Sequence, residues 1–365
     1  MQFSPLSLFL IAAVVASAQS PAPSPPQTPQ VWQMQDSGST AGLRGIDSVD
    51  GTVAWASGTE GTVLRTTDGG AHWKKCAVPD GDKDGATLDF RGVQAWDSTT
   101  AIVMASGPGD KSRLFKTTDG CKTWTLLFRN PDEKGFWDAI KFDGRREGMI
   151  LGDPVDGRFA MFITLDGERW TRQTPDGSEA DGSKESIFAA SNTSLVQFTM
   201  LAHRFFVTGG PGGPLFFRCD GELFPGGKPE NVRCSKNPVH IPLASGTASS
   251  GAFSLGFAST GLVAVGGDYR KPNDSTGTAA WSSPGGDDWT ASTTPPHGYR
   301  STVQWSESEK LWITAGTNGS DLSRDDGRTW QPLDNGNWNA LSLPFIVGPK
   351  GRIARLNPSA IPPSQ

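Results

Sequence analysis

Short apolar segments with interspersed polar positions recur along most of the chain and predict β-strands rather than helices. The first segments of the recurring units are LRGIDSV (43–49), FRGVQAW (90–96), FWDAIKF (136–142), AFSLGFA (252–258) and YRSTVQW (299–305). A second short apolar segment follows each of them, and a Gly-rich turn leads to a third. Beyond the N-terminus, no long segment places apolar residues at i, i+3, i+4 and i+7, so amphipathic helices are not expected.

A turn of hydroxyl residue, Asp, Gly and Trp closes several of these units. It is written RTTDGGAHW (65–73), KTTDGCKTW (116–124), ITLDGERW (163–170) and SRDDGRTW (323–330). Its acidic residues are Asp68, Asp119, Asp166 and Asp325. The closing aromatic residues of successive units are Trp73, Trp124, Trp170, Phe224, Trp289 and Trp330, which lie 51, 46, 54, 65 and 41 residues apart.

Four short strands at a period of this length are typical of a propeller blade. Six units carry the turn or its remnant, and a seventh is split between the two ends of the chain. Residues 340–357 supply its inner strands, and residues 31–38, with Trp32, supply the outer one. The sequence therefore predicts an all-β, seven-bladed propeller of four-stranded antiparallel blades over 31–357, closed by pairing of the N-terminal strand with the C-terminal blade.

The recurring turn has a structural explanation. Its carboxylate can accept hydrogen bonds from backbone N–H groups that follow it, and its Gly takes the positive φ that the turn requires. The Trp is expected to pack between neighbouring sheets, which places the motif at the rim. Calcium binding is not expected, because one Asp in each turn supplies too few oxygen ligands.

The ends of the chain differ in composition from the repeats. Leu6 to Ala16 is an apolar run too short to span a bilayer comfortably, and a small-residue cleavage site follows, so residues 1–18 are expected to be a signal peptide. A retained membrane anchor is the alternative, and the cleavage site has no Cys for a lipid anchor. Residues 19–30 are expected to form a Pro-rich linker and residues 358–365 a tail. The mature protein is expected to be periplasmic or secreted.

Four Cys in an exported chain predict two disulfides. Cys219 and Cys234 flank a candidate hairpin, which leaves Cys76 and Cys121 for each other, although the sequence alone leaves other pairings open. The chain has no CxxC and its 4 His are scattered, so no metal site is expected. GGPGGP (209–214) is followed by a strand-like segment rather than a helix, so no nucleotide or other cofactor is expected.

The turns match the Ser/Thr-x-Asp-x-Gly-x-x-Trp pattern of the Asp-box, or BNR, repeat, fully at 66–73 and 323–330. Cys121 replaces the second Gly of the turn at 117–124, and the turn at 164–170 is one residue short. The longer pattern, L-R-G-V followed by the turn, resembles the repeat of photosystem II stability/assembly-factor-like propellers over about 31–357. This resemblance implies a non-catalytic scaffold that binds a protein or peptide partner.

Sialidases also carry Asp boxes and are the enzyme alternative. Resemblance to them implies three Arg around a substrate carboxylate, a Tyr–Glu nucleophile pair and an Asp acid/base. Here the Arg-Ile-Pro signature is absent, and only Tyr269 and Tyr299 are present, neither with an obvious Glu partner. A sialidase-like glycoside hydrolase acting on an anionic or other glycan is the second hypothesis.

Strand direction alternates within a blade, so the loops that lead into the first strand and those between the second and third strands share one face, here called the loop face. Arg44, Arg91 and Arg300 begin innermost strands and are expected to converge there, where guanidinium groups suit a carboxylate. Trp137 and Phe253 are expected to add apolar contacts. Local pairing of each Arg with an acidic residue is the alternative.

Asp153 and Asp268 follow Gly at the ends of apolar strands on the same face. A facing carboxylate pair could perform acid–base chemistry, whereas pairing with the rim Arg residues is the simpler interpretation. The net charge of −5, with both signs interspersed, argues against a nucleic-acid binder. We therefore expect an exported monomer, without a membrane segment after signal removal, that binds a protein or peptide through its carboxylate.

Overall fold

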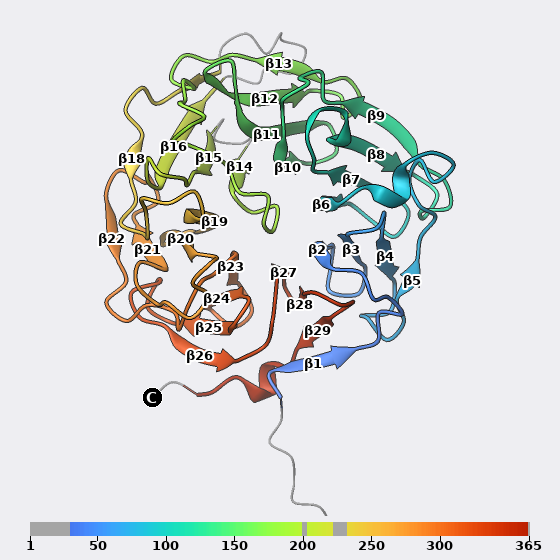
Figure 1. Cartoon of the computed structure of the whole chain (residues 1–365). Helices are drawn as coiled ribbons and strands as arrows, with labels where there is room; N and C mark the ends of the chain where they lie inside the picture. The colour runs from blue at the N-terminus through green and yellow to red at the C-terminus, as the bar shows by residue number, and fades with distance from the viewer. Residues whose placement is uncertain (1–29, 199–202, 222–231, 364–365) are drawn as a thin grey trace, which may run out of the picture.

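The computed structural model describes residues 30–198, 203–221 and 232–363 of the chain. These residues form seven antiparallel sheets arranged in a ring around a central axis (Figure 1). In six sheets the strands follow the order of the sequence outward from the axis, and the seventh combines both ends of the chain (Figure 1). The prediction of an all-β, seven-bladed propeller is confirmed.

The first three blades are regular four-stranded sheets. Blade 1 contains β2 (Leu43–Ser48), β3 (Ala54–Gly58), β4 (Val63–Thr66) and β5 (Lys74–Lys75). Blade 2 contains β6 (Phe90–Ala95), β7 (Ala101–Ala105), β8 (Arg113–Thr117) and β9 (Thr125–Arg129). Blade 3 contains β10 (Trp137–Asp143), β11 (Glu147–Val155), β12 (Arg158–Thr164) and β13 (Thr171–Gln173).

The remaining blades include one with an extra strand. Blade 4 contains β14 (Leu195–Phe198), β15 (His203–Val207), β16 (Leu215–Asp220), β17 (Arg233–Cys234) and β18 (Val239–His240). Blade 5 contains β19 (Ser250–Ala258), β20 (Gly261–Asp268), β21 (Ala279–Ser282) and β22 (Trp289–Ala291). Blade 6 contains β23 (Thr302–Ser306), β24 (Leu311–Gly316), β25 (Gly319–Ser323) and β26 (Gln331–Asp334). Blade 7 contains β27 (Ala340–Ser342), β28 (Phe345–Val347), β29 (Ile353–Leu356) and β1 (Trp32–Gln35).

Blade 7 closes the ring by joining the two ends of the chain, as predicted. β1 pairs antiparallel with β29, with Trp32 opposite Leu356 and Gln35 opposite Ile353. The Trp32 indole N–H also donates a 2.9 Å hydrogen bond to Ser320 Oγ of blade 6. Because β1 covers the outer edge of β29, the blade that begins and ends the chain has its full set of four strands.

The hydrophobic core is divided among the interfaces between blades. Each pair of neighbouring blades encloses one cluster of buried apolar side chains, such as Phe90 and Phe115 of blade 2 against Trp55 of blade 1. The short 3-10 helices are η1 (Gly85–Thr87), η2 (Gly109–Lys111) and η4 (Pro358–Ala360). In the described ranges, no helix has the length and apolar character needed to cross a bilayer.

The recurring turn joins the third and fourth strands of its blade. In blade 1 the Thr66 hydroxyl donates a 2.8 Å hydrogen bond to Asp68 Oδ1 and accepts one from the Gly70 N–H at 3.0 Å. Asp68 Oδ1 also accepts the His72 N–H at 2.9 Å. The bonds from Thr117 to Asp119 and from Ser323 to Asp325 repeat this arrangement at 2.9 and 2.8 Å. In the shorter turn of blade 3, Asp166 accepts the Arg169 N–H at 2.8 Å.

The aromatic residue of each turn packs toward the preceding blade. The Trp73 ring lies edge-on to Phe345 of blade 7, with ring centroids 5.6 Å apart. Trp124 meets Trp55 of blade 1 in the same way at 6.5 Å, and Trp170 stacks on Phe128 of blade 2 at 6.4 Å. Trp330 joins the cluster shared by blades 5 and 6. The carboxylates therefore shape the hairpin, and the indoles fasten one sheet to the next.

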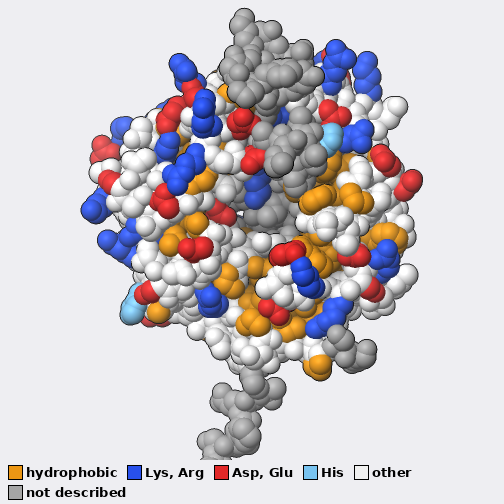
Figure 2. Space-filling model, turned by 180° about the vertical axis from the view of Figure 1, so that it is seen from behind, with side chains coloured by type: hydrophobic (Ala, Val, Ile, Leu, Met, Phe, Trp, Pro, Cys, Tyr) orange, Lys and Arg blue, Asp and Glu red, His pale blue; other side chains and the backbone are white. Residues whose placement is uncertain are grey.

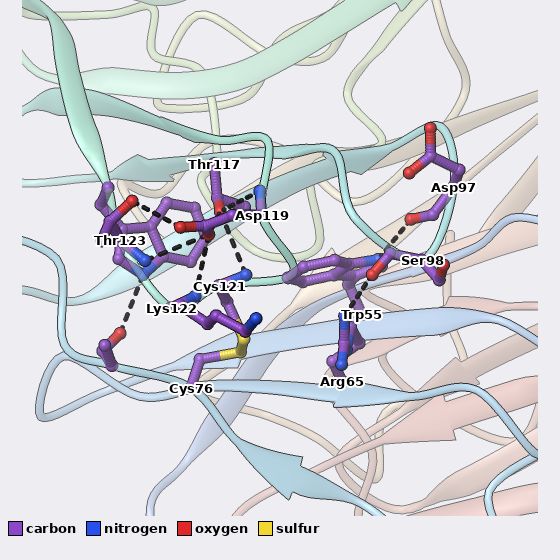
Figure 3. Close-up of a disulfide and its surroundings, with 12 residues drawn as sticks. Trp55, Arg65, Cys76, Asp97, Ser98, Thr117, Asp119, Cys121, Lys122 and Thr123 are labelled. Carbon is purple, nitrogen blue, oxygen red and sulfur yellow. Dashed lines mark hydrogen bonds between the residues drawn. A yellow bond between two sulfur atoms is a disulfide. The ribbon is translucent and has the colours of Figure 1, made fainter.

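Two disulfides are present, with the pairing that the sequence favoured. Cys76–Cys121 links the end of blade 1 to the turn of blade 2, where Cys121 takes a φ of 64° in place of Gly (Figure 3). Cys219–Cys234 joins the paired strands β16 and β17. The predicted signal peptide (1–18) and Phe224 lie outside the described residues.

Candidate functional site

A pocket of about 500 Å³ lies on the loop face, where innermost strands begin and second strands end. Residues from six of the seven blades line it, together with part of the connection between β13 and β14. We call it the axial pocket. Its chemically distinctive side chains are Arg44, Arg91, Asp138, Asp153, Phe253 and Tyr269. Two basic, two acidic and several aromatic groups thus share one concave site near the axis.

A β-bulge directs several of these side chains into the pocket. The register of the first two strands shifts at Arg44 in blade 1, Arg91 in blade 2, Asp138 in blade 3 and Phe253 in blade 5. A bulge leaves one residue without a cross-strand partner and re-aims its side chain. The same structural position therefore delivers a side chain to the pocket from each of these four blades.

Blades 6 and 7 contribute Ser301 and Asn339, which line the pocket and directly precede the innermost strands β23 and β27. Arg300 precedes Ser301 and points elsewhere: its side chain is 0% exposed and its Nε donates to Asp321 Oδ2 at 2.6 Å. The structure therefore brings Arg44 and Arg91 together and keeps Arg300 inside blade 6. The sequence alignment had placed Arg300 one residue out of step, because the YRSTV segment has one more residue before its Val than the FRGV segment.

Trp137 and Phe253 also differ in where they lie. Phe253 lines the pocket and stacks on Phe188, with ring centroids 3.8 Å apart. Trp137 is fully buried between blades 2 and 3, where it stacks on Phe128 at 5.3 Å. At the bulge, the residue that blade 3 contributes to the pocket is Asp138, the neighbour of Trp137. This residue was missed, although it is a charged position inside the apolar segment FWDAIKF and aligns with Arg44 and Arg91.

The connection between β13 and β14 reaches into the centre of the ring (Figure 1). Its residues 186–193, here called the crossing segment, are tied to the innermost strands of several blades. Asn192 accepts the Ile140 N–H at 2.8 Å, Ser191 donates to the Ser301 carbonyl at 2.6 Å, and the Thr193 carbonyl accepts the Leu255 N–H at 2.8 Å.

The crossing segment forms part of two cavities. Residues 186–190 line the axial pocket, and residues 191–193 line a second cavity of about 400 Å³ that also includes Asp47, Lys141 and Trp305. Seen from behind, the molecule carries Lys and Arg beside Asp and Glu around its edge (Figure 2).

Both Arg side chains of the pocket are accessible and share one acidic partner. Arg91 Nε donates to Asp89 Oδ2 at 2.8 Å, whereas Arg44 Nε is 4.0 Å from Asp89 Oδ1. The Arg44 and Arg91 side chains are 35% and 27% exposed. Burial and the neighbouring Arg91 charge lower the pKa of Arg44, although an arginine stays charged at physiological pH. Asp89 offsets only one of the two guanidinium charges, so the side of the pocket formed by Arg44 and Arg91 is basic.

The carboxyl groups of the pocket are Asp138 and Asp153. Asp138 is 1% exposed, and burial together with the charge of Asp153 raises its pKa well above the usual range. Burial raises the pKa of Asp153 to about 6, although its Oδ1 accepts the Ile187 N–H at 2.9 Å. Asp153 thus shares the pocket with Asp138 rather than with Asp268. Asp268 lies outside the pocket lining, and hydrogen bonds from Ser249 and the Arg270 N–H outweigh its burial and lower its pKa.

The aromatic wall consists of Phe188, Phe253, Tyr269 and Tyr299. Tyr299 is buried, and burial raises the pKa of its phenol far above the usual value. Tyr269 is 45% exposed and lies edge-on to Phe253 at 6.2 Å. No glutamate lines the axial pocket within the described ranges, so the Tyr–Glu pair of sialidases is not formed there. In the same part of the chain, no group of three or more His, Cys, Asp or Glu could hold a metal ion.

Comparison with known proteins supports the resemblance predicted from the repeat. No family model matches the chain. Over 369 aligned residues it is 23% identical to the photosystem II assembly lipoprotein Ycf48 of Synechococcus sp. (strain CC9902), covering 96% of this chain and 95% of the relative. The resemblance to photosystem II assembly-factor-like propellers is therefore confirmed.

Solved structures give the same result for the fold. YCF48 from Cyanidioschyzon merolae is 19% identical with a TM-score of 0.61, covering 90% of this chain and 99% of that one. A structure of YCF48 bound to D1 peptide is 17% identical with a TM-score of 0.59, covering 91% and 98%. The WD40 β-propeller domain of Doa1 is 9% identical with a TM-score of 0.51, covering 89% and 97%.

Proposed function

We propose that this protein is a non-catalytic binding scaffold that holds a peptide segment of a protein partner in the axial pocket. The observation that carries the proposal is the convergence of Arg44 and Arg91, each at a β-bulge, beside an aromatic wall in a pocket of about 500 Å³. The likeness to Ycf48, of which one solved structure is bound to D1 peptide, supports a peptide as the ligand.

The chemistry of the pocket favours a carboxylate as the group that is bound. Arg91 uses its Nε for Asp89 and one NH1 hydrogen for the Ala189 carbonyl at 3.2 Å. Other N–H donors of the two guanidinium groups have no hydrogen-bond partner among the described residues and can meet a ligand. Charge-assisted, bidentate hydrogen bonds are the strongest that such donors make. Phe253 and Tyr269 would pack against apolar side chains of the same peptide.

We further propose that the protein is exported and acts as a monomer, and that the pocket does not hydrolyse glycans. Residues 1–18 have the composition of a signal peptide, and two disulfides suit an oxidising compartment. The absence of a glutamate from the described lining of the pocket supports binding rather than sialidase-type catalysis.

An array of octapeptides, each synthesised with a free C-terminal carboxylate and again as the amide, tests the proposal. The wild-type protein is expected to prefer the free-carboxylate member of each bound pair. Arg44→Ala and Arg91→Ala should each weaken that binding about tenfold or more, as expected for lost charge-assisted hydrogen bonds. Arg270→Ala is the matched control, because Arg270 is an exposed arginine outside the pocket lining.

Equal binding of acid and amide peptides, or no effect of either pocket variant, would contradict the proposal. Turnover of a fluorogenic sialoside or of aryl glycosides, abolished by Asp153→Asn, would instead favour the hydrolase.

A further inference from the structure

Asp138 is an unexpected residue in a pocket proposed to bind a carboxylate. It lies at the bulge of β10, the position that supplies Arg44 from blade 1 and Arg91 from blade 2. It is 1% exposed, and its Oδ2 has no hydrogen-bond partner among the described residues. An unpaired polar atom buried at a pocket wall destabilises the free protein unless a ligand satisfies it.

The surroundings of Asp138 determine its protonation. The charged groups that act on it are Asp153 from β11 and Arg91 from β6, and the backbone N–H groups of Asp153 and of Ala189 in the crossing segment favour its ionised form. Burial and the repulsion from Asp153 outweigh these favourable contacts and raise the pKa of Asp138. A carboxylic acid held neutral in this way can donate a hydrogen bond to an anion, which a carboxylate cannot.

We infer that Asp138, in its neutral form, donates a hydrogen bond from Oδ2 to the carboxylate of the bound peptide, so that binding is linked to uptake of a proton. This inference rests on the proposed function and adds a specificity-determining residue to it. Arg44 and Arg91 supply the charge, and Asp138 supplies a donor that is present only when the site is protonated. A ligand with an amide in place of the carboxylate gains no comparable charge-assisted bond.

Proton linkage fixes the direction of the pH dependence. Below about pH 6, Asp153 is also neutral, and the pocket offers two guanidinium groups and an acid. As pH rises, ionisation of Asp153 and then of Asp138 places negative charge beside the ligand carboxylate. Affinity should then fall by up to about tenfold for each pH unit while one proton is taken up on binding.

The experiment measures the affinity of one free-carboxylate octapeptide from the array, and of its amide, by fluorescence polarisation between pH 5 and 8. Wild-type affinity for the acid peptide should fall about tenfold or more over this range. Asp138→Asn keeps a donor at every pH, so it should bind about tenfold more tightly than the wild type at pH 8. The double variant Asp138→Asn/Asp153→Asn should vary by no more than about twofold.

Asp268→Asn is the matched control, because this carboxylate ends a second strand on the same face but lies outside the pocket lining. It should follow the wild-type profile. A flat wild-type profile, or an Asp138→Asn protein that binds more weakly than the wild type at pH 8, overturns the inference.

These outcomes leave the proposed function intact as long as the Arg variants still lose binding, whereas equal affinity for acid and amide at every pH overturns the proposed function itself. An NMR titration of the side-chain carboxyl carbons in the free protein provides a test without peptide. If Asp138 titrates in the ordinary range of aspartate, the inference is overturned whatever the peptide-binding experiments show.

Discussion

Arg91 and Arg300 follow an aromatic residue at the start of an innermost strand, yet they have opposite surroundings. Arg91 stands at a bulge, is 27% exposed and reaches the axial pocket. Arg300 is 0% exposed, and its guanidinium bonds Asp321, the Tyr299 carbonyl and Asn318. The same residue type lines the axial pocket in blade 2 and is buried in the interior of blade 6.

The difference arises from one residue of register. In a strand, successive side chains point to opposite faces, so a shift of one position exchanges what is buried and what is presented. Ser301, which follows Arg300, lines the pocket where Arg91 does in blade 2. The position of a residue relative to the innermost strand, and not the presence of an arginine near the start of that strand, therefore decides which residues line the pocket.

Arg300→Ala is expected to have the largest effect on stability. It removes the arginine from a fully buried ion pair and leaves Asp321 with His297 as its remaining basic neighbour among the described residues, which costs about 3–5 kcal/mol of the free energy of unfolding. Arg91→Ala removes a partly exposed pair with Asp89 and should cost less than about 1 kcal/mol. Chemical denaturation of both variants checks this contrast. Equal losses would mean that the two arginines are both structural.

The propeller could be predicted from the sequence because its signals are local or strictly repeated. The turn at Asp68 needs only Thr66, Gly70 and His72, all within a few residues, and its hydrogen bonds form as the residue types suggest. The pairing of Trp32 with Leu356 followed from counting blades rather than from any local pattern. The local turn pattern and the number of repeats can both be recognised in a single sequence.

Part of the candidate site could not be predicted, because it depends on strand register and on contacts between residues that are far apart in the sequence. A bulge depends on the register against the next strand, so neither Asp138 nor the displacement of Arg300 was evident in a segment considered alone. The crossing segment lies in the most degraded repeat, and Ser191 meets Ser301 across 110 residues of chain. Its sequence, SIFAASNT, has no repeat counterpart to predict such contacts.

Ser301→Arg offers a gain of function at the position that blade 6 uses in place of an arginine. A third guanidinium beside Arg44 and Arg91 should tighten binding of the free-carboxylate peptide by about 1 kcal/mol, or about fivefold, and leave the amide peptide unaffected. Ser301→Gln controls for side-chain length without charge. Fluorescence polarisation measures both. Weaker binding of the acid peptide by the Arg variant would show that position 301 is not equivalent to position 91.

Substitution of His297 is expected to have the smallest effect on stability. It tests the buried network around Arg300 in blade 6. The His297 Nδ1 lies 2.7 Å from Asp321 Oδ1 and 3.0 Å from Arg300 NH2, and its Nε2 lies 3.0 Å from the Asn318 carbonyl. Each ring nitrogen therefore faces an acceptor, and Nδ1 also faces a donor. The hydrogen bond with Asp321 raises the pKa of His297, against the opposing effects of burial and of the Arg300 charge. The protonated form of the ring is therefore favoured in the folded protein.

A histidine whose pKa is raised on folding adds stability that is complete below the pKa of the unfolded chain, about 6.5, and is lost as pH rises through the folded value. Wild-type protein should therefore lose, between about pH 6 and 8.5, a stability increment of less than about 1 kcal/mol that His297→Gln lacks. Denaturation curves of the two proteins across this range isolate the increment, because Asp138 and Asp153 titrate in both. Parallel pH profiles would show that His297 is neutral beside Asp321, and that the Arg300–Asp321 pair alone accounts for the buried network.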